Sequence, residues 1–375
     1  MLRFHSILIP LLFAIFLAPL FATQAESISI LTEQGSFISA SHLRYEKAHF
    51  YQGDKKLVDF IECRFTGQSA QWYPSLFTID GQRFSGTLKK WSKRKGITWE
   101  TPEGKEILFP LLAVESIILK GQKKVVQHEQ VPYLQLDNGK PVFATINFVT
   151  PKSISVKSEF GKLKLDRNGV QSIQLKKSSK RIQKGSHSLI TKSGHRLFGD
   201  IQVLNDEYCT FKANGMTLKI PKSDLHHIRS MKYATFPKSF THKSTPFLQH
   251  IDEPVWNRNA KGEDLIVDGT PIWEGLSLHS KTLCTFKLKK PISHFVFRIA
   301  MDHSYPYIGP CVLKLKSGAI TKTWDLNHTT KTQWQSIALK GAKELSLTLD
   351  YGEKGSSGDR FILADPLFIP VGGVK

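Results

Sequence analysis

The sequence predicts an all-β protein, with a row of small β-barrels over residues 76–230 and a β-sandwich over residues 251–371. Apolar and polar residues alternate with a period of two, which is typical of strands that bury one face. A unit of strands and glycine turns recurs three times along the chain. The apolar fraction of 40% is ample for real cores, so wholesale disorder is excluded.

Residues 1–25 have the layout of a secretory signal peptide. Arg3 lies in a short polar start, residues 7–21 are almost entirely apolar, and residues 22–25 (Ala-Thr-Gln-Ala) form a small-residue cleavage site. An uncleaved membrane anchor is disfavoured, because the apolar run is about 15 residues and a spanning helix needs about 20. We therefore expect a secreted, periplasmic or cell-surface protein with no integral membrane segment after cleavage.

The repeated unit fills residues 76–230. Each copy opens with an alternating strand and a glycine turn and ends on an isoleucine: Ile117, Ile173 and Ile228. Pro or Asp stands seven residues before each isoleucine, which suits a tight turn before a last strand. Four or five short strands in about 45 residues predict a small barrel. The pattern resembles the SH3-like and Sm-like barrel class.

The segments around the three copies are less regular. Residues 26–75 contain a partial or divergent copy, because an alternating strand reaches Gly35 but the closing motif is missing. Residues 231–250 contain prolines and serines without clean periodicity, so we predict a linker there. Stacked repeats bury surface that one copy cannot cover, and we expect a spacer or an interaction platform.

The basic character belongs to the repeats rather than to the C-terminal third. Residues 251–375 hold 16 Lys and Arg against 13 Asp and Glu, whereas residues 1–250 hold 36 against 19. The densest clusters, residues 89–95 and 176–181, would attract acidic polymers such as acidic polysaccharide or nucleic acid. Each cluster is also explained as a solvated loop.

The four cysteines are Cys63, Cys209, Cys284 and Cys311, and none belongs to a C-x-x-C pair. Zinc and thioredoxin-type chemistry therefore have no support. Export permits disulfides, and Cys284 and Cys311 lie in neighbouring predicted strands. Either these two pair or the thiols are buried and free.

The C-terminal third has ordered motifs that resemble a known family. The motifs are Trp256-Asn257, residues 265–273 (LIVDGTPIW), residues 274–280 (EGLSLHS), residues 297–302 (FRIAMD), residues 347–350 (LTLD), Gly358-Asp359 and residues 364–367 (ADPL). They resemble the NPCBM domain, the carbohydrate-binding module of family-98 glycosyl hydrolases. Ser277 stands where the family signature has its second glycine, and Arg360 replaces the usual histidine. The resemblance implies a galactose-binding-like jelly roll, carbohydrate binding and a structural calcium ion.

Sugar sites pair an aromatic face with polar groups that bind hydroxyls, and the loop of residues 302–307 offers both. The candidate ligand-binding residues are Trp256, His279, Asp302, His303, Tyr305, Tyr307 and Asp359. Trp256 and His279 are also explained as core residues. Carboxylates that offer oxygens to calcium are Asp252, Glu253, Asp350 and Asp365, but no spacing specifies a site.

We predict no enzyme, because the sequence has no G-x-S-x-G elbow, H-E-x-x-H helix, P-loop or G-x-G-x-x-G turn. The sequence thus favours an exported, non-catalytic protein that binds glycans or cell-surface polysaccharide through its C-terminal domain. Two alternatives stay open. One is a binder of acidic polymers through the basic repeats, and the other is a protein scaffold at the surface.

Overall fold

The computed structural model describes residues 27–57, 60–65, 74–120, 128, 130–177, 185–231, 240–244, 254–257, 259, 265–268, 270–272, 274–303, 309–352 and 359–371. Residues 1–25, where the sequence predicts a signal peptide, lie outside these residues, as do Trp273, Tyr305, Tyr307 and most of residues 176–181. Within them the chain forms strands and three single-turn 3-10 helices, so the predicted all-β class is confirmed. No helix in the described ranges is long and apolar enough to cross a membrane.

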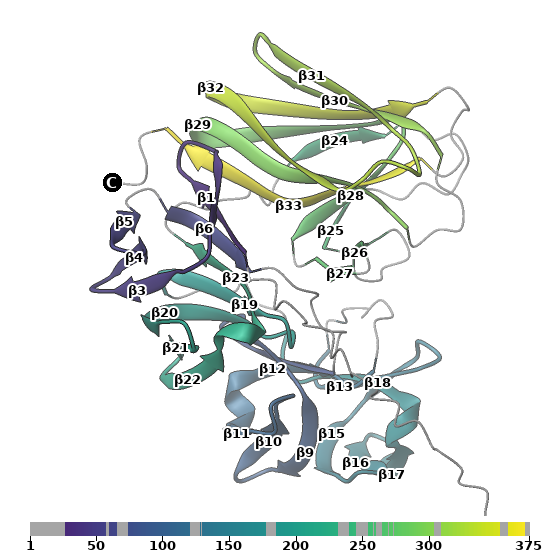
Figure 1. Cartoon of the computed structure of the whole chain (residues 1–375). Helices are drawn as coiled ribbons and strands as arrows, with labels where there is room; N and C mark the ends of the chain where they lie inside the picture. Colours follow the sequence, from purple (N-terminus) through teal and green to yellow (C-terminus); the bar gives the residue numbers. More distant parts are fainter. Residues whose placement is uncertain are drawn as a thin grey trace, which may run out of the picture.

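Four repeats precede the C-terminal domain (Figure 1). Repeat 1 consists of β1 (Ile28–Thr32), β2 (Phe37–Ala40), β3 (Arg44–Glu46), β4 (His49–Gln52), β5 (Lys55–Leu57) and β6 (Phe60–Phe65). Repeat 2 consists of β7 (Ser75–Thr78), β8 (Arg83–Ser85), β9 (Thr87–Ser92), β10 (Gly96–Glu100), β11 (Glu106–Phe109), η1 (Leu111–Ala113) and β12 (Val114–Ile118). Repeat 3 consists of β13 (Tyr133–Leu136), β14 (Pro141–Phe143), β15 (Thr145–Val149), β16 (Ser153–Ser158), β17 (Gly161–Asp166), η2 (Arg167–Gly169) and β18 (Val170–Gln174). Repeat 4 consists of β19 (His187–Thr191), β20 (Arg196–Leu204), β21 (Tyr208–Ala213), β22 (Met216–Pro221), η3 (Lys222–Asp224) and β23 (Leu225–Ser230).

The closing strand of each repeat pairs with its opening strand in one common register. The equivalent pairs are Cys63 with Ile30, Ile117 with Leu76, Ile173 with Leu134, and Ile228 with Leu189. All eight side chains are fully buried in one shared core. Residues 26–75 therefore hold a repeat with its own closing strand, although the sequence indicated only a partial copy. That strand escaped notice because Lys56, rather than Pro or Asp, stands seven residues before Cys63, so the closing motif is missing.

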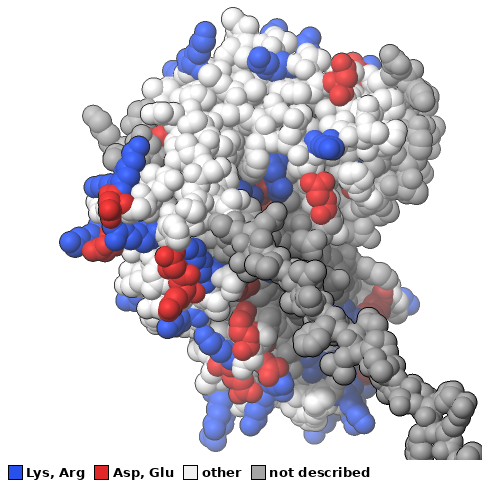
Figure 2. Space-filling model, in the orientation of Figure 1, with Lys and Arg blue, Asp and Glu red and all other residues white. Residues whose placement is uncertain are grey.

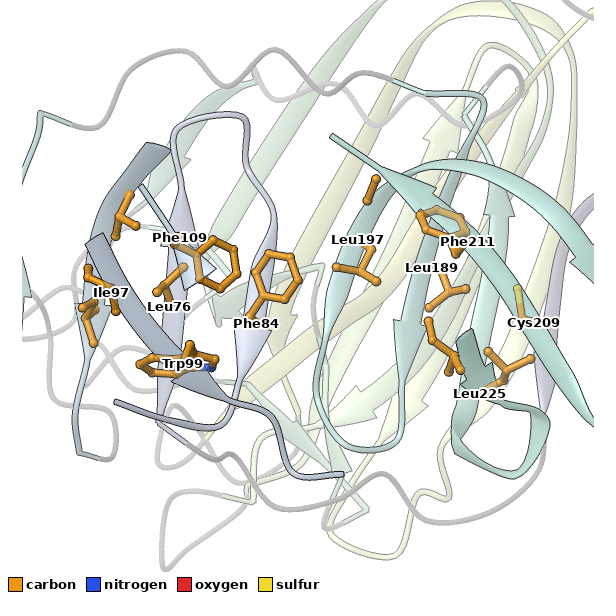
Figure 3. Close-up of a cluster of buried hydrophobic side chains, with 14 of the residues drawn as sticks. Leu76, Phe84, Ile97, Trp99, Phe109, Leu189, Leu197, Cys209, Phe211 and Leu225 are labelled. Atoms are coloured by element: carbon orange, nitrogen blue, oxygen red, sulfur yellow. The ribbon is translucent and has the colours of Figure 1, made fainter. Parts of the chain in front are cut away.

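The repeats associate in two pairs through their closing strands. β6 pairs with β23, where Cys63 faces Ile228, and β12 pairs with β18, where Ile117 faces Ile173. Both pairings are antiparallel, so each joins two barrels back to back across a continuous sheet. The strands β8 and β20 of repeats 2 and 4 share one β-bridge, between Arg83 and Arg196. Figure 3 shows the side-chain clusters of these two repeats facing each other, with Phe84 on one side and Leu197 on the other.

The C-terminal domain is a β-sandwich, as predicted. Its strands are β24 (Thr241–Ser244), β25 (Val255–Trp256), β26 (Ile266–Val267), β27 (Thr270–Pro271), β28 (Gly275–His279), β29 (Thr282–Met301), β30 (Cys311–Ser317), β31 (Ile320–Leu326), β32 (Gln333–Tyr351) and β33 (Arg360–Pro370). The long strands β29 and β32 pair along both of their halves, with an irregular register between Lys287 and Ile292. In one layer, β24 pairs with the first half of β29, the second half of β32 pairs with β30, and β30 pairs with β31. In the other layer, the second half of β29 pairs with β33, and β33 pairs with β28. Phe286 and Phe368 meet between the layers at 6.4 Å.

The strand β24 shows that the predicted linker is wrong for residues 241–244, since they pair with the start of β29. The sequence Thr-His-Lys-Ser of this strand has no apolar alternation, and three of its four side chains are exposed. It lies on one side of β29 at the margin of the sheet, where a strand needs no buried face.

The outer face of the β28–β33 layer is covered by other parts of the chain. Leu265, Val267 and Ile272, around the β26–β27 hairpin, pack over one end of it. Repeat 1 covers the other end, where Leu31 and Ile61 pack against three buried residues of the sandwich. Those three are Val296, Leu367 and Ile369. The sandwich and repeat 1 thus share an apolar interface.

Beside this apolar contact, seven charged residues form one alternating chain of ion pairs between the repeats and the sandwich. In order they are Arg196, Glu274, Arg229, Glu62, Arg64, Asp365 and Arg298. Nη1 of Arg229 lies 2.6 Å from Oε2 of Glu274, and Nη1 of Arg64 lies 3.4 Å from Oδ2 of Asp365. Although burial alone raises the pKa of Asp365, the charges of Arg298 and Arg64 hold it well below its usual range. Asp365 therefore stays charged at neutral pH.

Candidate functional site

Three chain segments converge at one end of the sandwich. The turn after β28 brings Ser280 beside the start of β33, and its amide donates to the carbonyl of Asp359 at 3.1 Å. The amide of Asp302, just after β29, donates to the carbonyl of Arg360 at 3.2 Å. This end carries His279, Asp302 and Asp359, all of which the sequence proposed as ligand-binding residues.

Asp359 is a buried carboxylate with unused hydrogen-bonding capacity. Its side chain is 2% exposed, and neither oxygen accepts a well-formed hydrogen bond from the residues that the structure describes. Burial raises the pKa of Asp359 to about 6, and the nearby Ser280 hydroxyl offsets this only partly. Buried polar groups are nearly always hydrogen-bonded, so an acceptor in this state is unusual and suits a ligand that brings donors.

His279 offers a second acceptor at the same end. Its Nδ1 lies 2.7 Å from the carbonyl oxygen of Ser280. A carbonyl only accepts, so Nδ1 carries the proton and Nε2 of the neutral ring is an acceptor. Nε2 is buried and has no hydrogen-bond partner among the described residues.

The rim of this end includes residues that the sequence did not single out. Lys281 pairs with Asp350 at 2.6 Å, and its Nζ lies 4.6 Å from the centre of the Tyr351 ring. Tyr351 is half-buried and faces Cys311 across the sheet. Tyr351 directly follows the motif of residues 347–350 in the sequence. This position next to a family-like motif was the signal that could have identified it as a site residue. His303 is exposed beside the buried Asp302.

Trp256 and Trp324 lie elsewhere. Trp256 of β25 lies opposite Leu276 of β28, and its ring packs against Phe240 with ring centres 5.8 Å apart. Leu276 is three residues from His279 along β28, a separation of about 10 Å. Trp324 contacts Phe297 of the core at 5.9 Å. These contacts fit packing roles, which the sequence analysis gave as the alternative for the tryptophans.

The carboxylates proposed for calcium do not converge among the described residues. Asp350 pairs with Lys281, and Asp365 binds Arg64 and Arg298 in the domain interface. Asp252 and Glu253 lie outside the described residues. In the part of the chain that is described, no three His, Cys, Asp or Glu side chains are grouped to hold a metal ion. Asp350 and Asp365 therefore do not fit a calcium site.

All four cysteines are buried and free. Burial raises the pKa of Cys311 to about 12, and the neighbouring charge of Asp359 adds to the shift. Of the two alternatives for Cys284 and Cys311, the structure therefore has the free thiols, which stay protonated at neutral pH.

The family comparison bears on this domain. The model of the NPCBM/NEW2 domain family matches residues 241–369, about a third of the chain. No curated protein matches the chain in sequence.

The chain is also similar to solved carbohydrate-binding modules. One is CBM51 from Clostridium perfringens GH95 in complex with methyl-galactose, at 12% identity and a TM-score of 0.31, covering 36% of this chain and 94% of that one. Another comprises the CBM51-2 and INT domains of Clostridium perfringens ZmpB, at 13% identity and a TM-score of 0.31, covering 49% of this chain and 40% of that one. A third is the tandem CBM51 modules of Sp3GH98, a family 98 glycoside hydrolase from Streptococcus pneumoniae, at 9% identity and a TM-score of 0.30, covering 67% of this chain and 96% of that one. The resemblance seen in the sequence is thus confirmed, and residues 241–369 form the part of this chain that matches the NPCBM/NEW2 domain.

Proposed function

We propose that this is an exported, non-catalytic protein that binds a glycan at the end of the sandwich formed by His279, Asp302 and Asp359. The observation that carries the proposal is the buried Asp359 carboxylate, which accepts no well-formed hydrogen bond from the described residues. Sugar hydroxyls are donors that would satisfy it, and Nε2 of His279 accepts a second one. The family match of residues 241–369 to a carbohydrate-binding module supports the same ligand class.

The ring of Tyr351 gives this end an aromatic surface, and sugars commonly place their C–H face against such a ring. The loop of residues 302–307, which the sequence singled out, begins at the same end. We assign His303, Tyr305 and Tyr307 to the ligand-contacting loop as part of the proposal.

The repeats act in this proposal as a rigid support. The ion-pair chain and the apolar contact with repeat 1 join the sandwich to the stack of repeats. The sugar-binding end would then keep one orientation relative to the repeats, rather than swing on a linker.

Glycan-array binding of residues 26–375, with and without calcium, tests the proposal. We expect selective binding of a neutral glycan that Asp359→Asn weakens at least tenfold and that Glu344→Gln leaves unchanged. Glu344 is exposed and lies opposite Lys287 in the β29–β32 ladder, away from the proposed end. Its substitution therefore controls for the loss of one negative charge. A blank array, or equal binding by both variants, would contradict the assignment.

Binding of acidic polymers by the basic repeats is the second candidate, because residues 1–250 hold 36 Lys and Arg against 19 Asp and Glu. On the face shown in Figure 2, acidic side chains are interspersed with basic ones along the repeats, which weakens a uniform field. Titration with heparin at two salt concentrations separates the candidates. Polyanion affinity falls steeply with salt, whereas neutral glycan binding does not.

A further inference from the structure

A cavity lies between repeats 2 and 4, far in sequence from the sandwich. Its volume is about 230 Å³. The two repeats meet beside it through Gln82, whose side chain donates to the carbonyl of Phe198 at 2.8 Å and accepts from the amide of Phe198 at 2.7 Å. These two hydrogen bonds and the Arg83–Arg196 bridge fix the spacing of the repeats and hold the cavity open.

The cavity has apolar walls and a polar floor. The walls come from Phe84 and Ile107 of repeat 2 and from Leu218, Ile220 and Pro221 of repeat 4. Figure 3 shows Phe84 on the side of its cluster that faces repeat 4. Polar residues of both repeats complete the lining, and they are Thr101, Glu103, Lys105 and Glu106 from repeat 2 and His195, Lys219 and Asp224 from repeat 4. We call Glu103, His195 and Asp224 the floor. A ligand here would contact both repeats at once.

The floor residues are held in place by hydrogen bonds. The amide of Ser85 donates to Nδ1 of His195 at 3.1 Å, so the proton of the neutral ring is on Nε2, which faces Oε2 of Glu103 at 3.4 Å. Ser193 donates to Asp224 twice, from its amide and its hydroxyl, each at 2.8 Å. The His195 side chain is nearly buried.

The Glu103 carboxylate carries charge at neutral pH. Burial alone raises the pKa of Glu103, but hydrogen bonds from His195 and Thr101 lower it to about 2. Burial and the charge of Glu103 raise the pKa of Asp224, whereas the two bonds from Ser193 oppose that shift. Glu103 and Asp224 line the same cavity, where the hydroxyl of Ser193 donates to Asp224.

The lysines of the cavity do not neutralise these carboxylates. Nζ of Lys105 donates to the carbonyl of Lys219 at 3.2 Å, and Nζ of Lys219 lies 3.8 Å from the centre of the Tyr208 ring. Among the described residues, neither Glu103 nor Asp224 has a Lys or Arg within ion-pair distance. Besides His195 beside Glu103, no basic side chain of the described residues lies within ion-pair distance of either carboxylate.

We propose that this cavity binds a small organic cation, with an ammonium group against Glu103 and Asp224 and an apolar body between Phe84 and Leu218. The negative floor selects a cation over a neutral or anionic compound of the same shape. The volume is below that of a pocket for a drug-sized ligand, so the occupant is of fragment size. The site is independent of the proposed glycan site, since no residue is shared.

Isothermal titration of residues 26–375 with benzylammonium tests the proposal, and benzyl alcohol serves as the uncharged compound of matched shape. We expect millimolar affinity for benzylammonium, which is usual for a ligand of this size, and at least tenfold weaker affinity for benzyl alcohol. Glu103→Gln and Asp224→Asn should each weaken benzylammonium binding about tenfold, and Leu218→Trp, which fills the cavity, should abolish it.

Glu159→Gln is the matched control, because Glu159 is an exposed carboxylate in a turn of repeat 3. It should leave the affinity unchanged. Equal binding of the alcohol and the ammonium compound, no heat with either, or an equal loss in the Glu159 variant would overturn the proposal. Thermal unfolding of each variant and its glycan binding are measured alongside, because a variant that folds and binds glycan but not benzylammonium localises the loss to this cavity.

Discussion

Replacing Asp359 by Asn tests whether the end of the sandwich is built for binding at the expense of stability. The pKa of Asp359 is about 6 in the folded protein and near 3.8 in an unfolded chain. One pKa unit corresponds to about 1.4 kcal/mol, so the buried carboxylate destabilises the fold at neutral pH by at most about 3 kcal/mol. Asn has no charge to desolvate, and its own unpaired amide costs about 1–2 kcal/mol of this gain.

The sign of the pH dependence follows from the raised pKa. The folded state binds a proton on Asp359 more tightly than the unfolded state does, so this group stabilises the fold increasingly as pH falls from about 7 through 6 towards 4. The Asn variant lacks this contribution. We expect it to be more stable than the parent at pH 7.5 by about 1–2 kcal/mol and to lose that advantage by pH 4.5.

Urea unfolding at pH 4.5, 6 and 7.5, followed by intrinsic fluorescence, measures these differences, and glycan binding is measured on the same samples. The expected result is a variant that is more stable at pH 7.5 but binds at least tenfold more weakly. Such opposition of stability and binding is typical of functional sites. A variant that is less stable at pH 7.5, with a pH dependence parallel to that of the parent, would refute the reasoning about burial.

Three further predictions follow from packing. Asp365→Asn leaves Arg64 and Arg298 without their shared carboxylate, so we expect a loss of about 3–5 kcal/mol in urea unfolding, whereas Asp350→Asn at the exposed pair with Lys281 should cost under about 1 kcal/mol. Gly35→Ala should lower the free energy of unfolding by more than about 1 kcal/mol, because Gly35 has φ of +72° and a Cβ would lie 2.7 Å from both His294 and Ser336. Gly53 also has positive φ but open space around it, so Gly53→Ala should lower the free energy of unfolding by less in the same assay. The four thiols should resist a thiol reagent in the native protein and all react in denaturant, and rapid labelling of Cys284 or Cys311 in the native protein would contradict their burial.

The alignment of repeats 2, 3 and 4 with one another was predictable from the sequence. Glycine turns and period-two alternation predicted the strands, and Ile117, Ile173 and Ile228 occupy equivalent places. The closing strand of repeat 1 was not predictable in the same way. Glu62 is buried in that strand because Arg229, 167 residues later, neutralises it. Such a partner cannot be inferred from the local pattern, which reads Glu62 as a solvent-facing residue.

The candidate site was predictable in part for a related reason. The motifs named His279, Asp302 and Asp359, and backbone hydrogen bonds bring their segments to one end. Trp256 was grouped with them by residue type, yet it pairs with Leu276 and packs on the core. Tyr351 was missed because its position at this end depends on the pairing of β30 with β32.

Two acidic residues within the family-like motifs have a role that the motifs do not reveal. Glu274 stands at the start of the signature of residues 274–280, and Asp365 stands in the motif of residues 364–367. Both bind arginines of the repeats, and the amide of Asp365 donates to the carbonyl of Glu274 at 2.8 Å. Glu274 therefore carries a domain contact immediately before β28, and His279, five residues later, ends that strand at the candidate site. The contact with the repeats and the candidate site thus lie at the two ends of one strand that pairs with β33.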